Sequence, residues 1–366
     1  MKVLQICDFA AKYRGNFIES LDYLEKNFFD ENDLMVYAFP SRMLKRNNAW
    51  FDEFRTQKKA EIYSSDYRSM ISNFRRIVIE NKIELIHTHF TDIKTDMCIN
   101  LACRGLKVKK IKHYRSSFGT WNRIKLFVSD ICYDKWSAVV CVSPFIGEEA
   151  GHNIRKAKSI VINDAVYLPR LDECERLYRK SYGISDDSIL CFMIGYDYRL
   201  KGIDLACEAV AELRKSKNIC LAICIASNKD KIESEIAGQF GGMPEYIKLL
   251  DPRQDIASYY NMADIYIQAS RSEGFCYAII EAAYCGKVVV ASDCPGMKSH
   301  AENNLSVLWF KNGSAEDLKE RINDACSFIG DGEFIENNRR SSVEKYGIKS
   351  YSEKIYGLYR EIIDKR

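Results

Sequence analysis

The sequence predicts an α/β fold made of two doubly wound, Rossmann-like domains, and three observations carry this prediction. Apolar runs of strand length alternate with longer helix-period segments throughout the 366 residues. The runs are apolar on both faces, which is typical of parallel strands covered by helices. A charged stretch near residues 165–187, holding one Pro and one Gly, divides the runs into two series, as an interdomain linker would.

The strands are expected in two series of six. The first series lies at 2–9, 33–39, 85–90, 109–114, 138–143 and 159–164. The second lies at 188–195, 219–226, 246–251, 264–270, 287–292 and 306–310. We therefore expect one domain over 1–168 and a second over 169–345. The last segment, 346–366, has apolar residues at helical spacing and is expected to pack back across the first domain.

Composition excludes several classes of protein. The apolar fraction of 47% and the charged fraction of 29% are ordinary for a globular chain and exclude a disordered or fibrous one. The start is too short for the apolar region of a signal peptide, and no apolar run approaches the ~20 residues that span a bilayer. We expect a cytoplasmic protein, with peripheral attachment to the cytosolic membrane face left open. The 14 Cys form no CxxC pair and the five His have no zinc-finger spacing, so free thiols and no metal are expected.

A basic run follows the middle of the first series. Between Asp96 and Asp130 the chain has no acid and eight cations: Arg104, Lys107, Lys109, Lys110, Lys112, Arg115, Arg123 and Lys125. Such a run fits either docking on anionic lipid or a solvated face, and both readings stay open. Nucleic-acid binding is not expected, because no aromatic-rich RNA signature accompanies the charges.

The segment 264–293 carries most of the functional argument. A buried strand is expected to end at Ser270, and a short loop then opens a helix that ends near Gly286. Glu273 and Glu281 are eight residues apart. With Glu273 at the helix start and Glu281 two turns in, both carboxylates should face one side. Ionised carboxylates accept hydrogen bonds from hydroxyls, as a sugar-binding site requires.

The start of the same helix is expected to bind an anion. The backbone N–H groups of Gly274, Phe275 and Cys276 would point out of the helix end, toward a phosphate. Gly274 would also let a ligand approach the backbone closely. Phosphate-binding amides beside two carboxylates predict a receptor for a sugar nucleotide. The alternative is structural: Glu273 as a partner of the helix dipole and Glu281 as a solvated helix residue.

The pattern S-x-x-E-G-F…E-A-x-x-x-G-x-x-V-V-A-S-D resembles retaining glycosyltransferase family 4, whose members have the GT-B fold and an E-x7-E motif. The resemblance implies that Glu273 contacts donor-sugar hydroxyls and that Glu281 binds the ribose of the nucleotide. It also implies that Ser270 and the Gly274–Cys276 loop belong to the donor site. The chain departs from the family pattern at Ala269, Cys276 and Lys287, and has Pro295-Gly296 where Gly-Gly is usual.

Further candidate residues follow from the same resemblance. Lys201 matches the Lys that grips the donor diphosphate, and Arg199 is expected to replace the family Arg, whose place Tyr196 takes. Two cations at a helix start would stabilise a diphosphate leaving group. His113 matches a His close to the donor sugar, although a lone His, like His87 or His89, is often a hydrogen-bonded core residue.

The expected acceptor site lies in the first domain. The family's Gly-rich loop is replaced here by Lys12–Asn16, in which Gly15 and Asn16 are the candidates, and a simple turn is the alternative. Arg115, at the end of the strand that carries His113, could meet an anionic acceptor.

The resemblance implies a retaining hexosyl- or N-acetylhexosaminyltransferase that takes a sugar from a nucleotide-diphosphate donor, UDP before GDP, to an acceptor hydroxyl. A carbohydrate, glycolipid or lipid-linked oligosaccharide acceptor in bacterial surface polysaccharide or glycolipid synthesis is expected. No resident cofactor or metal is expected, and no Asp-x-Asp pair is present. Two alternatives stay open: a sugar-nucleotide epimerase of the same fold, and a non-catalytic sugar-nucleotide-binding subunit of a transferase complex. A dehydrogenase is disfavoured because no GxGxxG follows the first strand.

Overall fold

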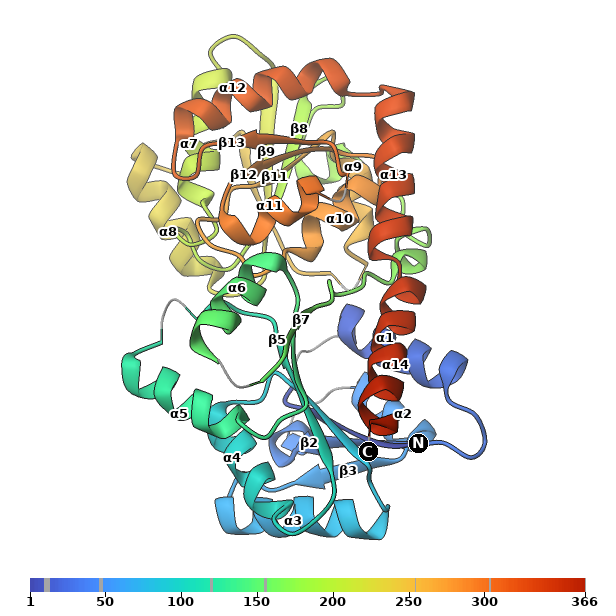
Figure 1. Cartoon of the computed structure of the whole chain (residues 1–366). Helices are drawn as coiled ribbons and strands as arrows, with labels where there is room; N and C mark the ends of the chain where they lie inside the picture. Colours follow the sequence, from blue (N-terminus) through green and yellow to red (C-terminus); the bar gives the residue numbers. More distant parts are fainter. Residues whose placement is uncertain are drawn as a thin grey trace. The chain divides into compact units, whose positions relative to one another are not determined.

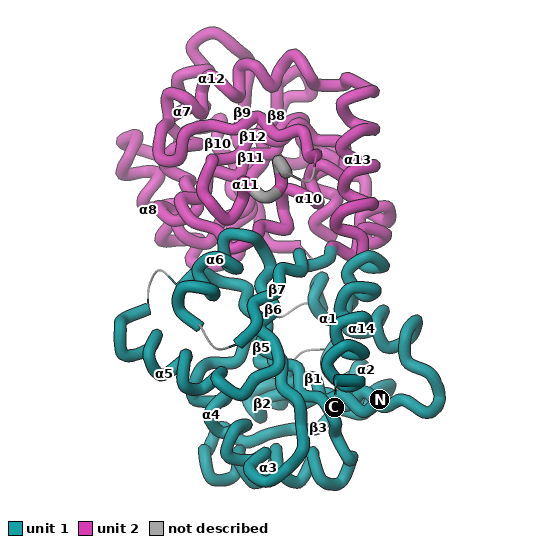
Figure 2. Tube along the Cα trace, viewed as in Figure 1, with its two compact units in different colours: residues 1–165, 348–366 teal, residues 166–347 magenta. Residues whose placement is uncertain are grey.

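The computed structural model describes residues 1–9, 14–45, 49–118, 121–154, 157–253, 255–302 and 304–365. The chain divides into two compact units (Figure 2). Unit 1 comprises residues 1–165 and 348–366, and unit 2 comprises residues 166–347. Each unit contains one parallel sheet. Two parallel sheets with helical crossovers confirm the predicted doubly wound α/β class.

Unit 1 contains a seven-stranded sheet in the order β3-β2-β1-β4-β5-β6-β7. Its strands are β1 (Lys2–Cys7), β2 (Leu34–Pro40), β3 (Ala60–Tyr63), β4 (Leu85–His89), β5 (Lys109–Tyr114), β6 (Ala138–Cys141) and β7 (Ser159–Val161). Its helices are α1 (Gly15–Phe28), η1 (Ser41–Lys45), α2 (Ala49–Gln57), α3 (Tyr67–Glu80), α4 (Ile93–Ala102), α5 (Arg123–Tyr133), α6 (Pro144–Asn153) and α14 (Ile348–Asp364). The last helix, α14, packs against α1 although 320 residues separate Phe28 from Ile348 (Figure 1).

Several helices of unit 1 begin at a polar residue that accepts a hydrogen bond from the first turn. Asp66 caps α3, Asp92 caps α4 and Asn122 caps α5, each accepting a backbone N–H three residues on. These side chains satisfy donors that the first helical turn leaves unpaired. The caps therefore fix where each helix starts after its strand.

Unit 2 contains a six-stranded sheet in the order β10-β9-β8-β11-β12-β13. Its strands are β8 (Ile189–Gly195), β9 (Ile219–Ile225), β10 (Ile247–Leu250), β11 (Ile265–Gln268), β12 (Val288–Ser292) and β13 (Val307–Phe310). Its helices are η2 (Leu168–Leu171), η3 (Arg179–Tyr182), α7 (Ile203–Leu213), α8 (Lys229–Phe240), α9 (Ala257–Met262), α10 (Tyr277–Tyr284), α11 (Pro295–Glu302), α12 (Ala315–Ala325), η4 (Cys326–Phe328) and α13 (Gly332–Tyr346).

The strand order of unit 2 reverses between β8 and β11, which are neighbours in the sheet. In an open α/β sheet, ligands bind beyond the carboxyl ends of the strands at such a reversal. The loops after Gly195 and after Gln268 begin at this point. They carry the predicted residues Lys201 and Glu273, so the fold brings the two segments to one edge of the sheet.

All twelve predicted strands are present, but β3 was not predicted. Its four residues are mostly half-buried at the edge of the sheet, so they lack the apolar run that marks the other strands. All 14 cysteines are free thiols, as expected. No helix in the described ranges is both long and apolar enough to cross a membrane.

Candidate functional site

Lys201 and Glu273 form an ion pair at the reversal point of unit 2. The Lys201 Nζ lies 2.5 Å from Glu273 Oε1, and each side chain is only 14% exposed. Burial disfavours the charged lysine, but the carboxylate outweighs this effect and raises the pKa of Lys201. The ammonium also lies 5.0 Å above the ring of Tyr196. The cation is therefore held in place. Among the described residues, Glu273 accepts one of its three N–H groups, which leaves two for another acceptor.

Gly202 explains how Lys201 reaches this position. Its φ is +65°, a conformation that suits glycine, and a Cβ there would lie 2.0 Å from the carbonyl oxygen of Ala269. The turn 197–203 is closed by backbone hydrogen bonds from Lys201 to Asp197 and from Ile203 to Tyr198. A larger residue at 202 would push Lys201 away from the end of β11.

A series of hydrogen bonds between buried polar side chains orients Glu273. Tyr266 donates a hydrogen bond of 2.6 Å to Gln268 Oε1. The Gln268 amide nitrogen donates to Ser270 Oγ at 2.7 Å and to Glu273 Oε1 at 3.1 Å. Ser270 is fully buried. The structure thus assigns Ser270 a contact with Gln268, which the sequence analysis did not name.

The helix after this loop begins later than the sequence analysis predicted. α10 starts at Tyr277, so Glu273 lies in the loop, four residues before the helix. The prediction that Glu273 and Glu281 share a helix face is therefore wrong. Cys276, directly before α10, has a φ of +70°, which is unusual for a residue with a side chain. The amides of Gly274, Phe275 and Cys276 accordingly belong to the loop and not to the first helical turn.

The loop is supported from α11. His300 is fully buried, and its Nε2 donates a hydrogen bond to the carbonyl oxygen of Phe275. The carbonyl can only accept, so Nδ1 is the acceptor, and it lies 2.8 Å from the hydroxyl of Tyr346. Burial lowers the pKa of His300 to about 4, so the ring is neutral near pH 7. Nothing in the sequence shows that His300 meets this loop, so its role could not be predicted.

Gly296 packs directly on the loop backbone. A Cβ at this position would lie 1.8 Å from the carbonyl oxygen of Glu273 and 3.1 Å from the carbonyl carbon of Gly274. The second residue of the Pro295-Gly296 pair is thus the one that the loop conformation requires.

Arg199 is separate from the Lys201–Glu273 pair. Its NH1 bonds Asp204 at 2.6 Å, and the side chain is largely exposed. Arg271 binds the same carboxylate through two nitrogens, at 2.8 Å each, and also donates to the carbonyl oxygen of Arg199. The three residues tie the turn after β8 to the loop after β11. The predicted role of Arg199 toward a diphosphate stays a prediction.

Glu281 is buried in α10 and is bound on both oxygens. Arg170, in η2, pairs with Oε1, and Tyr260, in α9, donates to Oε2 at 3.1 Å. Arg170 comes from the segment that the sequence analysis treated only as a linker. Its partnership with Glu281 could not be read from sequence spacing, because 111 residues separate them.

Three histidines meet at the carboxyl ends of β4 and β5 in unit 1. His87, His89 and His113 each offer a ring nitrogen, and these nitrogens lie within 4.8 Å of one another. His87 Nδ1 lies 2.6 Å from the Tyr359 hydroxyl and His89 Nε2 lies 2.8 Å from Gln5 Oε1. Burial lowers the pKa of all three rings well below the ordinary value, so they are neutral.

Arg115 completes this cluster. Its Nε and NH2 bind the carboxylate of Asp164 at 2.7 and 3.1 Å. It also contacts His89 Nδ1 at 3.2 Å and His113 Nδ1 at 3.4 Å, and its guanidinium lies over the rings of Phe17 and Phe90. Because the Arg115 guanidinium contacts two of the three rings, its positive charge disfavours the binding of a cation between them. The cluster fits a hydrogen-bonded core of neutral rings, and the roles expected for His113 and Arg115 in catalysis and acceptor binding stay predictions.

The expected acceptor loop is described only at its end. Residues 10–13, which include Lys12 and Tyr13, lie outside the described ranges. Gly15 has a φ of +62° and begins α1, and Asn16 follows it in the first turn, largely buried. The turn at Gly15 is therefore present, and acceptor binding by both residues stays a prediction.

Part of the basic run 104–125 is internal. Lys112 is buried, and its Nζ binds Asp96 at 2.7 Å and the carbonyl and hydroxyl of Thr91 at 2.6 Å each. Lys110 and Arg115 are also largely buried. These three cations therefore belong to the interior of unit 1, and the two readings, docking on anionic lipid or a solvated face, stay open for the exposed cations of the run.

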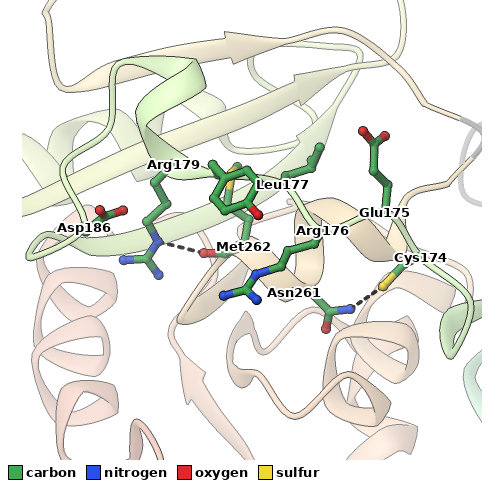
Figure 3. A pocket seen from close by; sticks show the side chains of 9 residues that line it. Cys174, Glu175, Arg176, Leu177, Arg179, Asp186, Asn261 and Met262 are labelled. Carbon is green, nitrogen blue, oxygen red and sulfur yellow. Dashed lines mark hydrogen bonds between the residues drawn. The ribbon is translucent and has the colours of Figure 1, made fainter.

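A pocket of about 450 Å³ lies where the segment after η2 meets α9 (Figure 3). In its wall, Asn261 donates to the Cys174 sulfur at 2.8 Å and Arg179 donates to the carbonyl oxygen of Met262 at 3.0 Å. None of the predicted site residues lines this pocket. All of its lining residues belong to unit 2, and its contacts anchor the segment after η2 to α9.

Known proteins resemble this chain in sequence. Residues 175–341 match the family model described as glycosyl transferases group 1. The Campylobacter jejuni N,N'-diacetylbacillosaminyl-diphospho-undecaprenol alpha-1,3-N-acetylgalactosaminyltransferase is 31% identical over 169 residues, which are 45% of this chain and 43% of that protein. The GPI3 subunit of the Saccharomyces cerevisiae phosphatidylinositol N-acetylglucosaminyltransferase is 23% identical over 94% of this chain and 79% of its own. The match to the first of these relatives thus spans less than half of its length.

Solved structures resemble the whole fold. A glycosyltransferase from Rickettsia africae has a TM-score of 0.83 at 17% identity and covers 100% of this chain and 99% of its own. Anabaena HepE in complex with UDP-glucose has a TM-score of 0.76 at 16% identity, covering 99% and 100%. These likenesses show that the two parallel sheets are those of the GT-B glycosyltransferase fold. The family model of the glycosyl transferases group 1 matches residues 175–341, which lie in unit 2.

Proposed function

We propose that this chain is a retaining glycosyltransferase that transfers a hexosyl or N-acetylhexosaminyl group from a UDP-sugar to a hydroxyl of a lipid-linked acceptor. The observation that carries the proposal is the Lys201–Glu273 pair at the strand reversal of unit 2. A cation and a carboxylate fixed side by side match the two ends of a sugar diphosphate. The ammonium suits the phosphates and the carboxylate suits the sugar hydroxyls.

Lys201 stabilises the leaving diphosphate in this proposal. The bond between the sugar C1 and the phosphate oxygen breaks, and the bond from the acceptor oxygen to C1 forms on the same face. The acceptor proton passes to the departing phosphate oxygen. Negative charge grows on the diphosphate during this step, and a held ammonium in a partly buried site stabilises it by a few kcal/mol.

Glu281 and its partners hold the nucleoside. Ribose hydroxyls donate hydrogen bonds, and the Glu281 carboxylate accepts them while Arg170 and Tyr260 keep it oriented. Ser270, Gly274, Phe275 and Cys276 line the same donor site in the proposal, and Arg199 supports the diphosphate. The expected contributions of His113, Gly15, Asn16 and Arg115 belong to unit 1 and stay predictions.

The lipid-linked acceptor is supported by the names of the relatives. The Campylobacter relative is named for a diphospho-undecaprenol substrate, and the yeast relative is named for phosphatidylinositol. A UDP donor is supported by the similarly folded Anabaena protein, which was solved with UDP-glucose. Synthesis of surface polysaccharide or glycolipid is the proposed setting.

The stereochemistry of the product tests the proposal. The chain is incubated with UDP-sugars and polyprenyl-diphosphate sugars, and the anomeric configuration of the new linkage is read by NMR coupling constants. An α-configured product from an α-configured donor is expected. A β-configured product would contradict retention, and interconversion of the UDP-sugar without transfer would favour the epimerase alternative.

A further inference from the structure

Lys110 is a buried cation without a carboxylate partner. It is the second residue of β5 and only 9% exposed. Its Nζ donates to Asn100 Oδ1 at 2.5 Å and lies 5.6 Å from the ring centre of Trp136. No carboxylate among the described residues forms an ion pair with it. Burial lowers the pKa of Lys110, as expected for an ammonium that no anion balances.

The neighbouring Lys112 shows what Lys110 lacks. Two residues along the same strand, Lys112 has the Asp96 carboxylate at 2.7 Å. Asn100, the acceptor for Lys110, is neutral, and its oxygen also accepts the Trp136 Nε1–H at 2.9 Å. Two N–H groups of the Lys110 ammonium thus have no acceptor among the described residues. Buried charges are normally paired, so this position calls for an anion.

Lys110 faces a cavity that is large enough for one. The cavity has a volume of about 600 Å³ and lies between the end of α4, the start of β5 and the end of α5. Arg104 and Lys135 also line it, while Asp134 is the one acid in its wall. Three cations against one acid favour a ligand with at least one negative charge, such as a phosphate group.

Exposed apolar side chains adjoin this cavity. On α5, Ile124 is 74% exposed and Phe127 is 66% exposed, and Ile131 follows one turn later on the same face. On the neighbouring α4, Met97 and Leu101 are exposed one turn apart (Figure 1). Ile131 also lines the cavity, so the apolar rows continue to its mouth. Contiguous exposed apolar groups beside cations are typical of a surface that meets a membrane.

We propose that this face of unit 1 docks on an anionic phospholipid membrane, with one lipid phosphate in the Lys110 cavity and the apolar rows of α4 and α5 among the acyl chains. We define this phospholipid face as Met97, Leu101, Arg104, Lys110, Ile124, Phe127, Ile131 and Lys135. Exposed Lys94, Arg123 and Lys125 flank the rows, so the charge complements an anionic surface. A soluble phosphate compound would leave the exposed apolar side chains of α4 and α5 without a partner. An acidic protein surface would leave the buried Lys110 ammonium without one.

The face lies away from the strand ends that carry the predicted acceptor residues of unit 1. Lys110 is near the amino end of β5, whereas His113 and Arg115 are at its carboxyl end. Membrane attachment can therefore be disturbed without touching those residues. The inference stands apart from the proposed reaction, because vesicles without sugar or nucleotide test it.

Co-sedimentation with vesicles measures the docking. The full chain is mixed with vesicles of phosphatidylcholine alone or of phosphatidylcholine with phosphatidylglycerol. Preferential binding to the anionic vesicles is expected, weakened by salt. The Arg104→Gln/Lys135→Gln variant should lose about fivefold in affinity per charge. Lys110→Met, which keeps an unbranched side chain one heavy atom shorter, should lose a similar factor. Ile124→Ser/Phe127→Ser should weaken binding to both kinds of vesicle.

Matched controls use exposed residues elsewhere. Lys59→Gln/Lys354→Gln removes two exposed cations from the same unit, and Val343→Ser removes an exposed apolar side chain of unit 2; both should bind as the unaltered chain does. The proposal is overturned if anionic and neutral vesicles bind equally, or if the face variants, folded by circular dichroism, bind unchanged. Titration with inorganic phosphate separates the sources: phosphate binding that depends on Lys110 without vesicle binding would make the ligand soluble and would contradict docking.

Discussion

At the scale of single residues, the account depends on the ion pair between Lys201 and Glu273. Each side chain is mostly shielded from water, so the attraction between them is screened less than that of a surface pair. The hydrogen bond from Gln268 reaches the same Glu273 oxygen and fixes which way the carboxylate points. A pair held in this way is prepared for a charged ligand before the ligand arrives.

Glu273→Gln should nearly abolish sugar transfer while leaving the fold intact. The amide has the size of the carboxylate but loses its charge toward Lys201 and accepts hydroxyl hydrogen bonds less strongly. Turnover should fall by about a hundredfold, the effect of removing a well-placed transition-state contact. Steady-state kinetics measure it, and Glu336→Gln, an exposed change on α13, is the control. Near-normal turnover would remove Glu273 from the site.

Lys201→Ala should lower turnover by about tenfold or more, because the leaving diphosphate loses its cation. Lys231→Ala on the surface of α8 should leave the rate unchanged. Rapid mixing separates the chemical step from donor binding. An unaltered chemical rate in Lys201→Ala would mean that other groups hold the diphosphate.

Lys112→Met should destabilise unit 1 strongly, in contrast to Lys107→Gln. Removing Lys112 leaves the Asp96 carboxylate buried beside the Thr91 and Tyr133 hydroxyls without its cation, at a cost of about 3–5 kcal/mol. Lys107 is exposed, so its replacement should change stability by less than about 0.5 kcal/mol. Urea unfolding followed by circular dichroism compares the two. Equal midpoints would show that the buried pair is not required.

At the scale of elements, the loop between β11 and α10 is shaped by the helix that follows β12. Gly296 and His300 of α11 contact the loop backbone at Glu273 and Phe275. The carboxylate is thus positioned by a segment more than twenty residues further along the chain. The sequence motif marks this loop, but it does not show that α11 holds the loop in place.

Gly296→Ala should displace the loop and weaken donor binding. The new methyl group would collide with the Glu273 carbonyl, so the backbone of the loop would have to shift. This shift should lower the free energy of unfolding by about 1–3 kcal/mol. Gly238→Ala, inside α8 with open space around it, should instead stabilise the chain by about 0.5–1 kcal/mol. Calorimetric titration with UDP and thermal unfolding measure both effects. Unchanged UDP affinity in Gly296→Ala would contradict the assigned contact.

The elements also show how far sequence reasoning reaches. Twelve of the thirteen strands in the described residues could be predicted because most of them lie in apolar runs, as is typical of parallel strands covered by helices. The edge strand β3 could not, because its four residues include the charged Glu61 and form no apolar run. The helix after Glu273 was placed too early, since Cys276 takes a left-handed conformation that its residue type does not signal. Arg170, Tyr260 and His300 were missed because long-range contacts bring them to the site.

At the scale of the whole molecule, buried neutral histidines should make the chain sensitive to acid. The pKa of His300 is lowered from 6.5 to about 4, and those of His87, His89 and His113 are also lowered. Below pH 6.5 the histidines of the unfolded chain bind protons, whereas the buried rings of the folded chain stay neutral to lower pH. The free energy of unfolding of the chain therefore decreases as the pH falls from 6.5 toward 4.

For His300 alone, this loss should reach about 3 kcal/mol by pH 4. Urea unfolding at pH 7.5 and pH 4.5 compares the unaltered chain with His300→Gln. The difference between their free energies of unfolding should be smaller at pH 4.5, because only the unaltered chain loses the contribution of His300. His152→Gln, an exposed change on α6, should leave the pH dependence as it was. A difference that stays constant between the two pH values would contradict the buried, neutral assignment of His300.

The most direct test of the central claim is a panel of nucleotide sugars. The chain is incubated with UDP-, GDP-, ADP- and dTDP-sugars and lipid-linked acceptors, and mass spectrometry detects both the free nucleoside diphosphate and the extended acceptor. The account predicts release of UDP from one matching donor, with equal amounts of extended acceptor, and loss of both signals in Glu273→Gln. If no nucleotide sugar is consumed, or if Glu273→Gln transfers as well as the unaltered chain, the Lys201–Glu273 pair is not a donor site and the proposed function is wrong.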